Sequence, residues 1–249
     1  MFNTTINRGM RTQVYRSGVI NSYNANVFDC VPKSASKYLA YKGVQELLKK
    51  RPTRPMKALD FGCGLGDSTN LLSRLGYQAV GVDHDPQMIR IAKERQRDTR
   101  FVNVSGESLP FGKNHFDLIY SSFVVLEMSS IISLVNYFKT AYDVLSDAGK
   151  MIIVTANPAI YDPQRSWLAL KADEKNVCFP GNKVSVKVVD ADVSFDDYFW
   201  TESELKLAAA AAGFKVSKTL YPLGDEEDGY EWQDELMHST NLLLELVKD

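Results

Sequence analysis

Apolar positions alternate between two spacings in the central part of the chain. Residues 58–61 and 79–82 are short, mostly apolar runs, which are typical of strands buried on both faces. Between them, Leu71, Leu72 and Leu75 recur at the spacing of one helical face. Strand, helix, strand in this order favours a parallel sheet, because parallel neighbours need a crossover connection.

The same alternation continues towards the C-terminus. Further apolar segments follow within 101–111, 116–122, 150–155, 213–216 and 242–247. Helices are predicted from Ser34 to Lys50, from Asp85-Pro86, across Leu134 to Leu145 with an end near Gly149, and from Glu202 to Ala212. In open parallel sheets, ligands bind beyond the carboxyl ends of the strands.

Length and charge limit the possible functions. The chain has 249 residues, is 45% hydrophobic and carries a net charge of −2, so it predicts one α/β domain without a global basic field for nucleic acid. The apolar runs are shorter than the ~20 residues of a membrane span. We expect a cytoplasmic protein, since the start of the chain lacks the apolar centre of a signal peptide. Metal-ligand spacing is absent from the three cysteines, Cys30, Cys63 and Cys178, and no metal is predicted.

Three glycines at alternate positions follow the first predicted strand. Gly62, Gly64 and Gly66 stand where backbone must approach a ligand closely or adopt positive φ. The helix start that follows offers unpaired N–H groups. Asp83 ends the next strand, where a carboxylate can accept from both hydroxyls of a ribose. Together these residues indicate a site for a nucleoside cofactor.

The glycine spacing excludes a dinucleotide fingerprint. That fingerprint is G-x-G-x-x-G, whereas here the third glycine comes one residue early and Asp67 stands where the last glycine would be. A carboxylate there would repel a pyrophosphate. The run D-F-G-C-G-x-G resembles motif I of the class I S-adenosylmethionine (SAM) dependent methyltransferases instead. The resemblance implies SAM as cofactor and S-adenosylhomocysteine as product.

The resemblance continues in order along the chain. Residues 101–111 resemble the family's third strand and its adenine-side loop, residues 116–122 the fourth strand, and residues 150–155 the fifth. Small-molecule enzymes of the ubiquinone and menaquinone biosynthesis type are the branch that the chain resembles. The implied fold is a Rossmann-like doubly wound sheet of seven strands, mostly parallel, with an antiparallel last strand.

Cofactor contacts follow from the matched positions. The family usually has an acid where Ser105 stands, and either Glu107 or a backbone carbonyl takes over that contact to adenine. The cofactor-binding residues implied by the resemblance are Asp60, Gly62, Cys63, Gly64, Gly66, Asp83, His84, Met88, Glu107, Ser108 and Ser121.

Methyl transfer from a sulfonium is an in-line displacement, so the protein mainly aligns the reacting atoms. A base is needed only where the acceptor must lose a proton, and the sequence therefore names no certain catalytic residue. Glu127, shortly after the fourth predicted strand, is the candidate that faces the acceptor; the alternative is that it caps the next helix.

The acceptor half of the cleft must come from segments outside the matched core. The chain divides into an N-terminal helical cap (1–54), a cofactor-binding core (55–156), an insertion that roofs the site (157–200) and a C-terminal helix with strands (201–249). Aromatic candidates for the acceptor pocket are Tyr23, Tyr161, Tyr198 and Trp200. The alternative for each is ordinary core packing.

The predicted function is methyl transfer to O, N or C of a small molecule by a monomer or homodimer. Two alternatives remain at this stage. An RNA or protein methyltransferase is one, although Ser121-Ser122-Phe123-Val124 stands where an N-P-P-Y-type motif would be. A non-catalytic SAM-binding regulator or assembly protein is the other, because an intact glycine loop indicates binding but not turnover.

Overall fold

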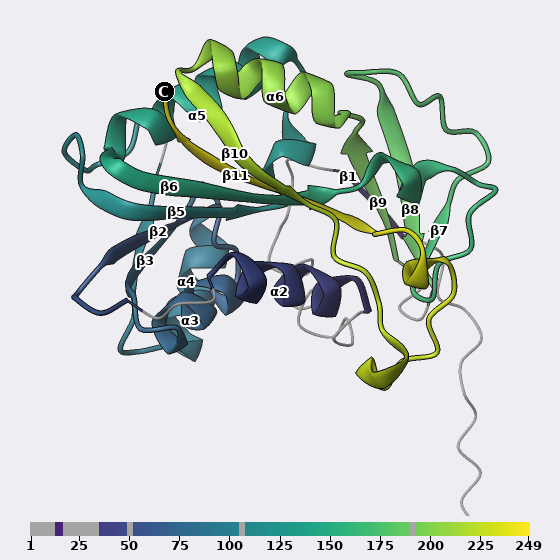
Figure 1. Ribbon diagram of the computed structural model, residues 1–249, viewed down its shortest axis with the longest axis horizontal. Helices are drawn as coiled ribbons and strands as arrows, with labels where there is room; N and C mark the ends of the chain where they lie inside the picture. Colours follow the sequence, from purple (N-terminus) through teal and green to yellow (C-terminus); the bar gives the residue numbers. More distant parts are fainter. Residues whose placement is uncertain (1–12, 17–34, 49–51, 105–107, 190–192) are drawn as a thin grey trace, which may run out of the picture.

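Two sheets organise the chain in a computed structural model, which describes residues 13–16, 35–48, 52–104, 108–189 and 193–249 (Figure 1). The larger sheet has the strand order β10-β11-β6-β5-β2-β3-β4, and the smaller one β1-β9-β8-β7. The strands are β1 (Gln13–Arg16), β2 (Lys57–Phe61), β3 (Gln78–Asp83), β4 (Arg100–Asn103), β5 (Phe116–Ser122), β6 (Leu145–Ala156), β7 (Leu170–Ala172), β8 (Lys183–Val188), β9 (Val193–Tyr198), β10 (Phe214–Leu220) and β11 (Asn241–Lys248).

The larger sheet confirms the predicted fold class. Strands β4, β3, β2, β5 and β6 pair in parallel. β11 is antiparallel to both of its neighbours, β6 and β10. This is the mostly parallel seven-stranded sheet with an antiparallel last strand that the sequence predicts.

Helices cover both faces of this sheet, as expected of a doubly wound fold. In Figure 1, α2, α3 and α4 lie below the sheet, and α5 and α6 lie above it. One buried cluster joins α5 and α6 to the sheet, and a second joins α2 and α3 to its other face. The helices are α2 (Ala35–Leu47), α3 (Asp67–Arg74), α4 (Pro86–Arg95), α5 (Ile131–Val144) and α6 (Glu202–Ala211), with single turns η1 (Val124–Glu127), η2 (Pro158–Tyr161), η3 (Glu226–Asp228) and η4 (Asp234–Leu236). None of the described helices is long and apolar enough to cross a membrane.

The C-terminal end of α5 differs from the prediction. The sequence pattern extends the helix across Leu145 to near Gly149, but the helix ends at Val144 and β6 begins at Leu145. Leu145 pairs with Phe116 of β5 and is fully buried. Apolar positions in a short window cannot distinguish the last turn of a helix from the start of a buried strand, so the helical period alone misplaced this boundary.

The smaller sheet is built largely by the segment predicted to be a roof. β7, β8 and β9 form an antiparallel unit, and β1 from the N-terminal region pairs in parallel with β9. The core of this unit contains Val184, Val186, Tyr161 and Phe199, together with Leu126 of η1. The smaller sheet therefore packs against the turn that follows β5, where the predicted site begins.

Candidate functional site

A cleft opens where β2, β3 and β5 end. It consists of two adjoining cavities of ≈ 540 Å³ and ≈ 370 Å³, both within the range usual for small-ligand sites. The two cavities share the residues at their junction: Gly62, Asp83, His84, Val124 and Glu127. The predicted glycine loop, strand-end acid and catalytic candidate thus lie at one place.

The glycine loop leaves room in the larger cavity at one position. Gly64 has φ +49, and a Cβ added there would meet no heavy atom within 4 Å. Gly62 differs, because a Cβ there would overlap Cγ2 of Val124. Gly62 therefore allows the packing of η1 on the loop, whereas Gly64 keeps main chain open to a ligand.

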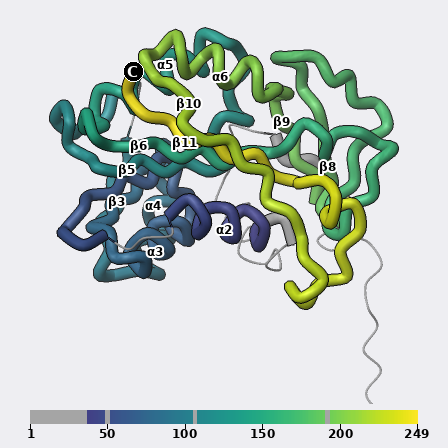
Figure 2. The backbone as a smooth tube through the Cα atoms, in the orientation of Figure 1, coloured from purple at the N-terminus to yellow at the C-terminus, as the bar shows by residue number. Residues whose placement is uncertain are grey.

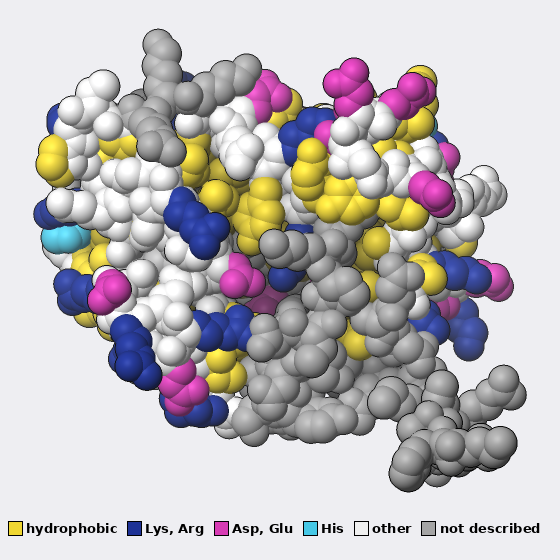
Figure 3. All heavy atoms as spheres, turned by 90° about the horizontal axis from the view of Figure 1, so that it is seen from below, with side chains coloured by type: hydrophobic (Ala, Val, Ile, Leu, Met, Phe, Trp, Pro, Cys, Tyr) yellow, Lys and Arg dark blue, Asp and Glu magenta, His cyan; other side chains and the backbone are white. Residues whose placement is uncertain are grey.

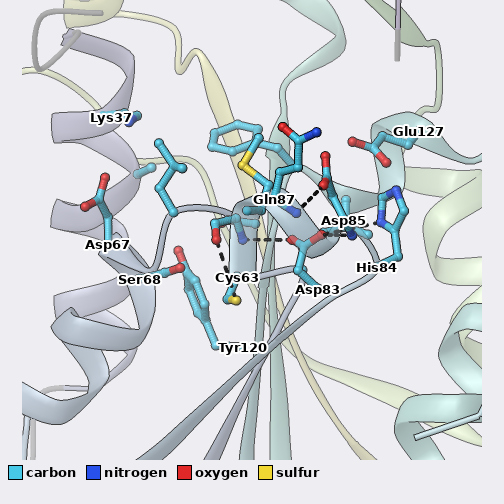
Figure 4. A pocket seen from close by; sticks show the side chains of 18 of the residues that line it. Lys37, Cys63, Asp67, Ser68, Asp83, His84, Asp85, Gln87, Tyr120 and Glu127 are labelled. Carbon is cyan, nitrogen blue, oxygen red and sulfur yellow. Dashed lines mark hydrogen bonds and ion pairs between the residues drawn. The ribbon is translucent and has the colours of Figure 1, made fainter. Parts of the chain in front are cut away.

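Asp83 is held in place by main-chain donors. Its carboxylate accepts from the N–H of Gly64 at 2.8 Å and from the N–H of Asp85 at 2.9 Å (Figure 4). Asp85 in turn accepts from the N–H of Gln87 and caps α4. The buried carboxylate is thus oriented at the cleft and joins the glycine loop to the end of β3.

His84 and Glu127 stand on one side of the junction (Figure 4). The His84 ring is exposed, and its Nδ1 lies 3.5 Å from Oδ1 of Asp83. Surrounding protein raises the pKa of Glu127, while His84 lowers it and Asp83 raises it. Its carboxyl is open to water in the cleft, yet protein surrounds it closely enough to disfavour its charge. Met88 of α4 lines the larger cavity.

Two predicted contacts, Asp60 and Cys63, differ in their access to the cleft. Asp60 is fully buried, lines neither cavity, and accepts from the hydroxyls of Ser68 and Thr69 at 2.6 Å. Burial raises its pKa to about 6, although these hydrogen bonds lower it in part. Cys63 lines the larger cavity, and burial raises the pKa of its thiol, which makes a thiolate nucleophile unfavourable.

Sequence reasoning missed the far end of the larger cavity. Lys37 and Tyr41 of α2 line it, together with Asp67 at the start of α3 and Tyr120 of β5. In Figure 4, Lys37 and Asp67 lie at the opposite end of the pocket from His84 and Glu127. Lys37 and Tyr41 are four residues apart on the predicted helix, a spacing that puts them on one face and could have indicated them.

Of the remaining predicted contacts, some line a cavity and others do not. Ser108 lines the smaller cavity. Ser121 lines neither, because its side chain is buried and accepts from the Tyr137 hydroxyl at 2.5 Å; its neighbour Ser122 lines the larger cavity instead. Glu107 and Tyr23 lie outside the described residues.

The described aromatic candidates line neither cavity. Trp200 is 6% exposed and donates through Nε1 to the carbonyl of Met128 at 2.9 Å. Tyr161 is also buried, and its hydroxyl donates to Asp197 at 2.7 Å. Tyr198 is half-buried, with Lys183 Nζ 5.5 Å from its ring centroid. The structure thus brings most of the described cofactor candidates together at the cleft, but not Asp60, Gly66 or Ser121. It places Tyr161 in the core of the smaller sheet, and Trp200 and Tyr198 in or beside the core of the larger sheet.

Comparison with known proteins gives a family match over the core. Residues 59–153 match the family described as a methyltransferase domain. An uncharacterized methyltransferase of Synechocystis is 38% identical over 85 residues, which are 32% of this chain and 40% of that protein. A ubiquinone/menaquinone biosynthesis C-methyltransferase of Psychromonas ingrahamii is 28% identical, over 43% of this chain and 45% of that protein. These alignments span less than half the length of either relative.

Longer alignments extend beyond the core. A mitochondrial ubiquinone biosynthesis O-methyltransferase of the rat is 29% identical over 69% of this chain and 58% of its own length. Among solved structures, a Pyrococcus horikoshii protein superposes with a TM-score of 0.64 at 19% identity, covering 89% of this chain and 98% of its own. A SAM-dependent methyltransferase of Listeria monocytogenes, described as putative, gives a TM-score of 0.63 at 18% identity, covering 87% and 100%. These structures support the fold.

Proposed function

We propose that this chain, which belongs to the class I SAM-dependent methyltransferases, transfers a methyl group to O, N or C of a small, partly apolar molecule. SAM is the cofactor of that family. The observation that carries the proposal is the arrangement of the cleft: the open main chain at Gly64 lines the larger cavity, and the oriented carboxylate of Asp83 lies with Glu127 at the junction of the two cavities.

The residues of the cleft fit the parts of SAM. The Asp83 carboxylate suits the ribose hydroxyls, and the space beside Gly64 suits the chain that follows the ribose. Opposite charges on Lys37 and Asp67 at the far end suit the amino-acid zwitterion. Ser108 and Leu109 in the smaller cavity suit the adenine side.

When bound, SAM supplies a methyl group that its sulfonium has already activated. The protein's part is then to hold donor and acceptor in line, which can lower the barrier by roughly 7–11 kcal/mol. Asp83 would fix the cofactor's position, and Phe123 and Val124 would keep water from the junction, since both line the larger cavity.

Two observations support a small acceptor. The named relatives include C- and O-methyltransferases of ubiquinone biosynthesis, whose names favour an aromatic, partly apolar acceptor for this chain. Basic and acidic side chains are also interspersed on the face shown in Figure 3, whereas a nucleic-acid backbone favours a continuous basic surface.

The proposal is tested by two measurements on the full chain. Calorimetry should show saturable SAM binding, and a panel of phenols, amines and enols should release S-adenosylhomocysteine with at least one member. Binding without turnover on any member would favour the non-catalytic alternative. Absence of SAM binding would overturn the proposal altogether.

A further inference from the structure

Phe123 follows β5 in a backbone conformation that residues with a side chain rarely adopt. Its φ is +63, and Asn114 is the other described non-glycine residue with a positive φ. Asparagine tolerates the left-handed region, whereas a bulky residue there is an outlier. The N–H of Phe123 donates to the carbonyl of Val154 at 2.8 Å, and its carbonyl accepts from the N–H of Leu126 at 3.2 Å. Backbone held in this way against its preference is found mainly at functional sites.

The strained turn places the Phe123 side chain in the wall of the larger cavity. Phe123 is half-buried and packs against two buried clusters, the one that joins α2 and α3 to the sheet and the one in the smaller sheet. It also lines the larger cavity, as do its neighbours Ser122 and Val124. Phe123 therefore gives the cavity an aromatic wall at the end of β5.

The order of the strands puts this wall on the path of the cofactor. β5, β2 and β3 are neighbours in that order and run in parallel, so their carboxyl ends lie along one edge. Under the proposed function, Asp83 at the end of β3 meets the ribose, and the chain that follows passes Gly64 after β2. In SAM the sulfur is bonded to the carbon that leaves the ribose ring. A ligand that runs from β3 across β2 therefore carries its sulfur towards the side that Phe123 lines.

Acidic side chains outnumber basic ones around the larger cavity. Of its described lining residues, Asp67, Asp83, Asp85 and Glu127 are acidic, and Lys37 is the only lysine or arginine. Within the described ranges, no lysine or arginine lies at ion-pair distance from these four acids. Such a cavity attracts a ligand with positive charge. A bound cation would also favour the charged form of Glu127, whose pKa burial raises.

We propose that the larger cavity selects the cationic cofactor over its neutral product, and that Phe123 is the specificity-determining residue whose ring contacts the sulfonium. The inference rests on the proposed methyltransferase function. An aromatic face attracts a cation most strongly where water is displaced. S-adenosylhomocysteine shares the adenosine and amino-acid parts of SAM but has a neutral sulfur, so it keeps the contact with Asp83 and loses this attraction. Methyl transfer thus weakens the binding of the spent cofactor and favours its release.

Calorimetry on the full chain tests this selectivity without an acceptor. The ligands are SAM, S-adenosylhomocysteine and sinefungin, in which a carbon with a charged amino group replaces the sulfonium. The unmodified chain should bind SAM and sinefungin about tenfold more tightly than S-adenosylhomocysteine. Phe123→Leu keeps an apolar side chain and removes the ring. It should reduce this preference to about twofold, and change the affinity for S-adenosylhomocysteine by less than about threefold.

A second substitution at the same position separates the charge distribution of the ring from its shape. Site-specific replacement of Phe123 by trifluorophenylalanine keeps an aromatic ring for packing but withdraws electron density from its face. The preference for SAM should fall as it does in Phe123→Leu, while the melting temperature stays close to that of the unmodified chain. A fluorinated ring that keeps the full preference would show that Phe123 contributes shape alone, and would overturn its contact with the sulfonium.

Tyr41→Leu is the matched control for loss of an aromatic ring. Tyr41 lines the same cavity, but it lies on α2 one turn from Lys37, which Figure 4 shows at the opposite end from Glu127. It faces the part that SAM and S-adenosylhomocysteine share, so this variant should weaken both ligands equally.

Glu127→Gln tests the contribution of the acids. Removing one lining charge should lower the affinities for SAM and sinefungin about threefold relative to that for S-adenosylhomocysteine. Glu94→Gln is its control, because Glu94 is exposed on α4, lines neither cavity and pairs with Arg90. The control should leave all three affinities unchanged.

The outcomes separate the two proposals. Equal affinities for SAM and S-adenosylhomocysteine in the unmodified chain, or sinefungin that binds only as S-adenosylhomocysteine does, would overturn the charge selectivity and leave the methyltransferase proposal standing. Equal losses for all three ligands in Phe123→Leu would have the same consequence for Phe123. Binding of none of the three ligands to the unmodified chain would instead overturn the methyltransferase proposal.

Discussion

The larger sheet supplies strand-end residues that line the cleft, whereas no described residue of the smaller sheet's strands lines either cavity. At the first, Gly64 and Asp83 stand at neighbouring strand ends and are joined by one N–H to carboxylate bond. At the second, Tyr161 and Asp197 come from segments 36 residues apart, and Trp200 is tied to Met128 across 72 residues. Local chain geometry thus fixes one half, and long-range packing fixes the other.

Under the proposed function, we expect this difference to separate recognition of the cofactor from recognition of the acceptor. A rigid strand end can hold one invariant ligand, while a separate layer of side chains can change without disturbing it. Substitution of Gly64, where an added Cβ would meet no protein atom within 4 Å, should therefore alter SAM affinity with little loss of stability. Substitutions in the smaller sheet should alter packing or acceptor chemistry with little change in SAM affinity.

The largest effect is expected for Gly64→Val. A Cβ at this position meets no protein atom within 4 Å but enters the cavity, and a branched side chain disfavours φ +49. SAM binding should become undetectable by calorimetry while circular dichroism still shows a folded chain. A Gly64→Val variant that retains SAM affinity would show that the cofactor does not pass this loop.

Gly62→Ala is the control that sharpens this result. Its Cβ would overlap the side chain of Val124, so the loop and η1 must separate. We expect this smaller substitution to lower the melting temperature more than Gly64→Val does, although it adds only one carbon.

The second-largest effect on SAM binding is expected for Asp83→Ala. Two charge-assisted bonds to ribose are worth about 1.5–3 kcal/mol each, and the same carboxylate holds the N–H of Gly64. SAM affinity should fall by at least about 100-fold, measured by calorimetry. Asp83→Asn should be milder, because its amide oxygen still accepts. Unchanged affinity in the alanine variant would remove Asp83 from the site.

Much of this cofactor half could be predicted from the sequence. Three alternate glycines and an acid at the next strand end require a particular backbone, and the alternation of strands and helices orders the sheet. Gly64 and Asp83 lie where these patterns place them. Even here, the roles of individual side chains were not predicted. Ser121 accepts a hydrogen bond from Tyr137, and Asp60 accepts one from Ser68 of α3. A period-two strand pattern does not show which neighbour a polar side chain contacts.

The acceptor half could not be predicted in the same way. The alternating run of β8 indicates a strand, but its partner and register decide that Asp197 shares a face with Val184. Aromatic composition predicted Trp200 and Tyr161 as pocket candidates, whereas the structure buries both in long-range contacts. Large aromatic side chains contribute mainly through buried area, and sequence spacing carries no information on which of them remain open to a cleft.

Trp200→Ala tests this packing role directly. Removing a buried tryptophan side chain costs about 3–5 kcal/mol, and here the Met128 carbonyl also loses its donor. Denaturant unfolding should show that loss, with SAM affinity of the folded fraction nearly unchanged. Tyr198→Ala is the comparison, because Tyr198 is only half-buried and should cost less. A normally stable Trp200→Ala variant with impaired acceptor kinetics would instead favour the original pocket hypothesis.

The smallest effect concerns a contact that joins α2 to the C-terminal region, two segments that Figure 2 shows side by side. Asp228 of η3 accepts from the Tyr38 hydroxyl at 2.8 Å and from Lys42 at 2.9 Å. Tyr38 and Lys42 share one face of α2 by their spacing of four, and Lys37 and Tyr41 share the adjacent face, which lines the cavity. The contact therefore holds the helix whose adjacent face lines the larger cavity.

Asp228→Asn should weaken SAM binding only a few-fold, because partly exposed ion pairs contribute about 0.2–1 kcal/mol. Burial raises the pKa of Asp228, but the bonds from Lys42 and Tyr38 outweigh it and leave that pKa lowered. A carboxyl with a lowered pKa contributes stability at neutral pH and loses it as pH falls through the lowered value. The melting temperatures of the two proteins should therefore differ at pH 7 and converge below the usual carboxyl range. A difference that persists in acid would show that the asparagine perturbs packing, and equal SAM affinity at pH 7 would show that α2 keeps its position without this contact.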